Sequence, residues 1–135
     1  MRVIEWNESY LTGHPIIDHQ HEALFDEINQ LVDAVARNQD EGELLRRVNH
    51  ISEMIREHFR CEEQLMREQR YPELAAHQHE HHQILENGEA LLKQCKEGGV
   101  HLAELLPRFI STWAVQHIVE DDARLAAFVR QRSRE

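Results

Sequence analysis

Residues 44–65 read LLRRVNHISEMIREHFRCEEQL and contain the pattern that decides the fold. One helical face recurs here in alternating steps of four and three residues, which is the spacing of a helix packed in a bundle. That face consists of Leu44, Val48, Ile51, Ile55, His58, Glu62 and Leu65. The spacing predicts a helix that follows the 38–42 break and runs to about residue 66. It also places a histidine and a glutamate where apolar side chains are expected.

Three further segments show the same helical periodicity. A helix is expected from about 18 to 37, with Asp18 as its N-cap. Another is expected from Pro72, a residue suited to a first helical turn, to the glycines at 98–99. A fourth begins after these glycines, and Pro107 either kinks it or marks its true start.

Four helices joined by short connections favour an all-α fold. We expect an antiparallel up-down-up-down four-helix bundle in one domain over residues 1–135. Residues 1–17 should form an irregular N-terminal arm whose aromatic side chains pack against the bundle. A short C-terminal helix follows the fourth helix.

Composition excludes several classes of partner. The 135 residues suit one core, and the net charge of −10, with Lys and Arg scattered, argues against nucleic acid and anionic membranes. No apolar run approaches a membrane span, and the amino terminus is too polar for a secretory signal. The isolated Cys61 and Cys95 indicate reduced thiols, so a cytoplasmic protein is expected. Exposed faces rich in Glu, Arg and Gln favour a monomer.

Polar residues able to bind metal interrupt the apolar faces of all four helices. Five imidazoles and two carboxylates in a core would be strongly destabilising unless something binds them. Antiparallel topology brings the start of the first helix, the end of the second, the start of the third and the end of the fourth together. The side chains that should meet there are His21, His58, Glu62, His77, His81, His117 and an aspartate at 121 or 122. The pattern predicts a site for two metal ions.

One histidine on an apolar face is more often a satisfied core residue than a ligand. Two pairs at i, i+4 spacing, His58 with Glu62 and His77 with His81, are hard to explain that way. Seven ligands exceed the four of a structural zinc, and imidazoles with bridging carboxylates suit iron, although zinc or manganese pairs fit the spacing too. The other histidines are expected at the surface: His14, His19, His50, His79, His82 and His101.

Four short motifs resemble the ligand motifs of the hemerythrin family, and the likeness to its single-domain bacterial members spans nearly the whole chain. The motifs are Asp18-His-Gln-His21, His58-Phe-Arg-Cys-Glu62, His77-x-x-x-His81 and His117-Ile-Val-Glu-Asp-Asp122. The resemblance implies a non-heme di-iron centre with a bridging oxo or hydroxo group. By this resemblance one iron is held by His77, His81 and His117 and the other by His21 and His58, with Glu62 and Asp122 as bridges.

The choice of aspartate depends on local helix geometry. A continuous α-helix would offer Asp121, at i+4 from His117, to the centre. The family pattern uses the five-residue step to Asp122, so we predict a helix that is broken or distorted between His117 and Asp122. If regular geometry persists there, Asp121 becomes the bridge.

The resemblance also implies reversible dioxygen binding, for carriage, storage or delivery, at the iron with an open position, and therefore no enzyme. Dioxygen would need a dry pocket. Candidates that flank the ligands by helical spacing, and could equally be ordinary core residues, are Leu24, Phe59, Trp113, Ala114 and Ile118.

Two other functions fit the same residues less well. An oxygen or redox sensor usually needs an output domain, for which the termini leave no room, although sensing through a partner protein stays open. A ferritin-like di-iron oxidase or ferroxidase uses Glu-x-x-His pairs, and this sequence contains none.

Overall fold

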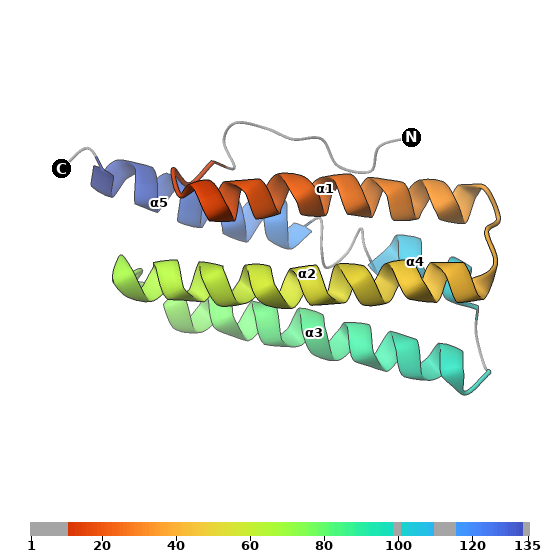
Figure 1. Ribbon diagram of the computed structural model, residues 1–135. Helices are drawn as coiled ribbons and strands as arrows, with labels where there is room; N and C mark the ends of the chain where they lie inside the picture. Colours follow the sequence, from red (N-terminus) through yellow and green to blue (C-terminus); the bar gives the residue numbers. More distant parts are fainter. Residues whose placement is uncertain (1–10, 99–100, 110–115, 134–135) are drawn as a thin grey trace.

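The computed structural model describes residues 11–98, 101–109 and 116–133, and these ranges are helical apart from short connections. The three long helices are α1 (Pro15–Ala36), α2 (Glu41–Glu68) and α3 (Leu74–Lys96). They lie side by side and run in alternating directions (Figure 1). The chain returns through α4 (Leu102–Phe109), the π-helix η3 (His117–Asp122) and α5 (Ala123–Ser133). The predicted antiparallel four-helix bundle is confirmed.

Helix α1 begins three residues before the predicted start, which shortens the expected arm. Pro15 occupies the first turn, where its missing N–H and fixed φ suit a helix. His14 is the N-cap, and its Nδ1 accepts a 3.5 Å hydrogen bond from the Ile17 N–H. The predicted cap, Asp18, instead accepts hydrogen bonds from the backbone and hydroxyl of Thr12 at 2.8 and 2.9 Å. Asp18 therefore ties the preceding loop to the first turn. The arm's aromatic residues, Trp6 and Tyr10, lie outside the described residues.

The next two helices start in different ways, because a side chain caps α2 whereas α3 has no side-chain cap. Asp40 caps α2 by accepting a 2.9 Å hydrogen bond from the Glu43 N–H. Helix α3 starts at Leu74 rather than at Pro72, which lies in the preceding turn. Helix α4 begins five residues before Pro107, so this proline does not mark the helix start.

Two apolar clusters form the core and leave a polar layer between them. One cluster joins Leu24, Ile28, Leu31, Ala34, Leu44, Ile51 and Leu102. The other joins Ile17, Leu65, Met66, Tyr71, Leu125 and Val129. On α1, His21 stands between members of the two clusters, and His58 and Glu62 do so on α2. The second cluster therefore closes the end of the bundle towards which the predicted ligands converge. Among the helices of the described ranges, none has an apolar stretch of the length that a membrane crossing needs.

Candidate metal centre

The structure brings all seven predicted ligand residues into one buried cluster. α1 supplies one histidine, α2 a histidine and a glutamate, α3 two histidines, and η3 a histidine and an aspartate. They are His21, His58, Glu62, His77, His81, His117 and Asp122, with exposures between 0% and 4%. Polar side chains that are this deeply buried need hydrogen bonds, opposite charges or a metal ion to offset the cost of losing water.

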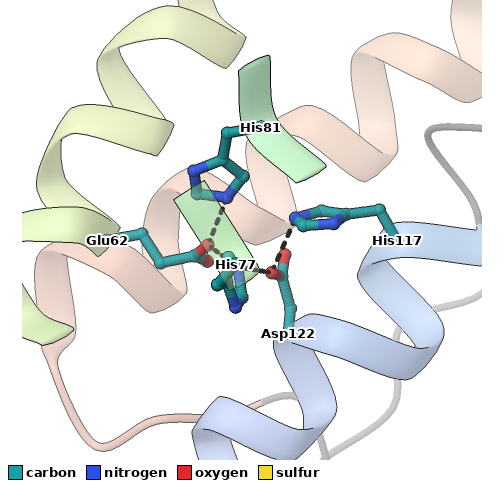
Figure 2. A group of neighbouring side chains, drawn as sticks. All are labelled: Glu62, His77, His81, His117 and Asp122. Carbon is teal, nitrogen blue, oxygen red and sulfur yellow. Dashed lines mark hydrogen bonds and ion pairs between the residues drawn. The ribbon is translucent and has the colours of Figure 1, made fainter. Parts of the chain in front are cut away.

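Glu62 links α2 to the two histidines of α3. Its Oε1 lies 2.8 Å from His77 Nε2 and 2.9 Å from His81 Nε2, and both imidazoles turn towards it (Figure 2). Its Oε2 lies 3.1 Å from His58 Nε2, one turn earlier on α2. The same Oε2 lies 3.7 Å from His21 Nε2, so one carboxylate faces four imidazoles. The i, i+4 spacing brings His58 to the same face of α2 as Glu62.

Asp122, not Asp121, faces the centre. Residues 117–122 form a π-helix, which confirms the predicted distortion. A π-turn brings residues five apart onto the same side, so Asp122 Oδ1 lies 3.1 Å from His117 Nε2. The same oxygen lies 3.1 Å from His77 Nε2, while Oδ2 lies 2.8 Å from His21 Nε2. Asp122 is fully buried, whereas Asp121 is partly exposed.

The ligand atoms form two overlapping groups that share Glu62 and Asp122. In each group the candidate donor atoms lie within 4.8 Å of one another. The larger group adds His77, His81 and His117, and the smaller adds His21 and His58. Two clusters with common carboxylates suit two cations bridged by those carboxylates.

Several buried polar atoms of the cluster lie close to one another without forming a hydrogen bond. His58 Nε2 and Glu62 Oε2 lie 3.1 Å apart without forming a hydrogen bond, and His117 Nε2 and Asp122 Oδ1 do the same. Buried polar atoms without hydrogen bonds are costly. Imidazole nitrogens and carboxylate oxygens are donors that iron, zinc and manganese accept. The residues present therefore fit a pair of divalent cations.

Without metal, protons supply the positive charge. Burial alone would lower the pKa of His58, but the charges of Glu62 and Asp122 and their contacts with the ring together raise that pKa to about 9. Burial likewise opposes the bonds to Asp122 and Glu62 that raise the pKa of His77 to about 9. Against burial, the charge of Asp122, the contacts with both aspartates and the charge of Glu62 together raise the pKa of His117 to about 11. Burial raises the pKa values of Glu62 and Asp122, yet the facing histidines hold both well below their usual range.

These shifts predict the pH dependence of the metal-free protein. The raised histidine pKa values give stability that is complete below pH 6.5, the ordinary histidine value, and is lost as pH rises through 9. We expect urea denaturation to show a loss of at least about 2 kcal/mol between pH 6.5 and 9. Metal must displace these protons, so the stabilisation by added zinc should grow over the same range. Metal-free stability that rises towards pH 9 would contradict this electrostatic account.

A small apolar cavity adjoins the cluster. It measures about 20 Å³, which is room for one very small molecule, and it touches His58, His117 and Asp122. Its apolar wall consists of Leu24, Ile28, Ile55, Phe59 and Ile84. Leu24 and Phe59 thus lie where the sequence placed them. Trp113, Ala114 and the side chain of Ile118 lie outside the described residues.

Sequence reasoning missed the partners of the outward-facing histidine nitrogens. Nδ1 of His58, His81 and His117 lies within hydrogen-bonding distance of Gln20, Glu63 and Asp121, respectively. Glu63 and Asp121 each adjoin a predicted ligand, Glu62 and Asp122. A helix turns by about 100° per residue. The sequence therefore predicted that these neighbours of the ligands face solvent. Of the histidines predicted at the surface, five are exposed, while His14 is half-buried as the cap of α1.

An antiparallel bundle that buries five imidazoles and two carboxylates around one centre belongs to the class of metal-binding helical bundles. The model of the hemerythrin HHE cation binding domain matches residues 12–129. The chain belongs to the hemerythrin family, as its motifs predicted.

Relatives and solved structures agree with this membership. Bacteriohemerythrin of Methylococcus capsulatus is 28% identical over 123 residues, which are 90% of this chain and 93% of that protein. Bacteriohemerythrin of Campylobacter jejuni is 26% identical over 129 residues, covering 94% and 96%. The crystal structure of wild-type hemerythrin aligns with a TM-score of 0.80 at 26% identity and covers 94% of this chain and 98% of its own.

Proposed function

We propose that this protein binds dioxygen reversibly at two non-heme irons held by the seven clustered residues. The observation that carries the proposal is the unequal division of ligands. Five residues surround one position and four surround the other, with Glu62 and Asp122 common to both. The position of His21 and His58 has one protein donor fewer, which leaves room for a small exogenous ligand. A di-iron pair would supply the two electrons that dioxygen takes up and returns.

The small cavity beside His58 suits an apolar gas better than it suits water. The 20 Å³ cavity beside His58 has an apolar wall, to which Leu24 and Phe59 contribute. Phe59 also stacks on His81, with ring centroids 3.7 Å apart. Water has few polar partners in such a space, whereas dioxygen needs none. We propose Leu24 and Phe59 as pocket residues, with Trp113, Ala114 and Ile118 as further candidates.

We propose a binding protein rather than an enzyme, built as one domain over residues 1–135. Its relatives bear the name bacteriohemerythrin, which supports a carrier, storage or delivery role. A monomer is supported by the surface, because Ile16 is the sole large apolar side chain with high exposure in the described ranges. Cys61 and Cys95 are free thiols, which supports a reducing compartment such as the cytoplasm.

An optical titration tests the proposed function. Iron-loaded protein, reduced without oxygen, should gain a charge-transfer absorption that saturates at one dioxygen per two irons and disappears when oxygen is removed. Protein loaded with zinc, which has no redox chemistry, is the control and should show no oxygen-dependent band. Continuous oxygen consumption with a reductant would identify an oxidase instead, and an unchanged spectrum would reject dioxygen binding.

A further inference from the structure

Two pairs of consecutive acidic residues each place one carboxylate inside the cluster and the other at its outer edge. Glu62 and Glu63 lie on α2, and Asp121 and Asp122 lie in η3. The inner members, Glu62 and Asp122, are fully buried. The outer members, Glu63 and Asp121, each keep 22% of the side chain exposed. The same arrangement thus arises twice, from two different elements.

Each pair holds one histidine at both ring nitrogens. His81 directs Nε2 to Glu62 at 2.9 Å and Nδ1 to Glu63 at 2.9 Å. His117 directs Nε2 to Asp122 and Nδ1 to Asp121, at 3.1 and 3.0 Å. An ionised carboxylate can only accept, so once a metal replaces the proton between Nε2 and the inner carboxylate, the proton that the ring keeps lies on Nδ1. The Nε2 lone pair of each ring is then aimed at the centre.

Both outer carboxylates are themselves anchored. Gln78 of α3 donates a 3.0 Å hydrogen bond to the Oε1 atom of Glu63. The Arg124 guanidinium lies 3.7 Å from the Oδ1 atom of Asp121. A second contact leaves each carboxylate less freedom to turn away from its histidine.

The smaller ligand group has a different partner at the corresponding position. His58 Nδ1 lies 3.2 Å from the Oε1 atom of Gln20, a neutral amide oxygen. A carboxylate therefore contacts Nδ1 of two histidines of the five-residue group, whereas in the described ranges the partner of His58 Nδ1 is a neutral amide. An anionic acceptor makes an imidazole a stronger electron donor than a neutral acceptor does.

We propose that Glu63 and Asp121 are positioning residues that fix His81 and His117 as Nε2 ligands and strengthen metal binding at the five-residue position, whereas Gln20 leaves His58 a weaker donor. The inference for iron rests on the proposed function. If iron is the metal, the two carboxylates favour its ferric state at the five-residue position. The amide favours the ferrous state at the position with room for a ligand. The sequence thus encodes unequal electron donation to two metals that share their bridges.

Zinc binding tests the proposal without iron or oxygen. Glu63→Gln and Asp121→Asn keep the shape of each side chain and remove its charge. We expect each to lower the affinity for one of two zinc equivalents by about 10- to 100-fold in a chelator competition. Glu80→Gln is the matched control. An oxygen of Glu80 lies within 4.8 Å of donor atoms of His117 and Asp121, yet Glu80 makes no hydrogen bond to a ligand histidine in the described ranges.

Two further readouts separate positioning from structural support. In the zinc-loaded parent, nitrogen-15 spectra should show the proton on Nδ1 of His81 and His117. In the iron protein, Glu63→Gln and Asp121→Asn should raise the midpoint potential, and Gln20→Glu should lower it. Unchanged zinc affinity in both variants, an equal loss in Glu80→Gln, or a proton on Nε2 of either ring would overturn the proposal. If the two variants lost zinc affinity as expected but the iron protein bound no dioxygen, the proposed function would be rejected and the positioning role of Glu63 and Asp121 would stand.

Discussion

Replacing Glu62 with glutamine should abolish binding of both metal equivalents. Glu62 belongs to both ligand groups, and its two oxygens face four histidines on three helices. The metal-free variant should also lose about 3 kcal/mol of unfolding free energy, because removing one partner from a buried ionic cluster leaves the others uncompensated. Elemental analysis after zinc or iron loading measures the first effect, and urea denaturation at pH 6.5 measures the second.

A glutamate on the same helix provides the control for Glu62→Gln. Glu68 is exposed and its carboxylate accepts a hydrogen bond from Gln64. Glu68→Gln makes the same chemical change and should keep two metals and stability within about 0.5 kcal/mol. If Glu62→Gln retained two tightly bound metals, Glu62 could not be the shared ligand.

Replacing His77 with alanine should remove one metal equivalent and much of the stability together. His77 Nε2 lies 2.8 Å from Glu62 and 3.1 Å from Asp122, so it faces both shared carboxylates. Its loss leaves two buried anions short of a partner and opens a space in the core, and we expect a cost of about 3–5 kcal/mol. His21 and His58 remain, so the smaller ligand group should keep its metal at reduced affinity. Metal stoichiometry and denaturation of the loaded protein measure both effects.

His79 stands two residues further along α3 and is exposed, which makes it the matched control. His79→Ala should leave both the metal content and the unfolding free energy close to those of the parent. A His77→Ala protein that kept full stability and two metals would mean that His77 is an ordinary core residue. Should the variant fail to fold without metal, refolding with excess zinc offers a second measurement, because metal binding contributes to folding.

Helical periodicity was sufficient to predict the architecture and the face of every cluster residue except Asp122. His58 and Glu62 lie one turn apart on α2, and His77 and His81 do so on α3, so their inward direction follows from the 3.6-residue turn. The predicted start of the first helix was less accurate, because two nearby residues could each serve as its N-cap. Helix α1 starts at Pro15 under a His14 cap, although Asp18 looked like the better N-cap.

The π-helix shows how a sequence pattern can require an irregular element. Asp121 and Asp122 are chemically identical, and regular helix geometry favoured the former. The structure turns Asp122 inwards and leaves Asp121 at the outer nitrogen of His117. The wider π-turn allows both aspartates to contact one imidazole.

Apart from the choice between Asp121 and Asp122, the amino-acid order alone determined which residues face inwards and at what depth, because turn geometry and antiparallel connection suffice for that. Only the packed structure decided which carboxylate oxygen lies against which imidazole nitrogen, and which residues contact the outer nitrogens of the histidines. Those features depend on the relative height and rotation of neighbouring helices and on side-chain rotamers. Contacts such as Gln20 with His58 join residues from different helices, so no periodicity within one helix encodes them.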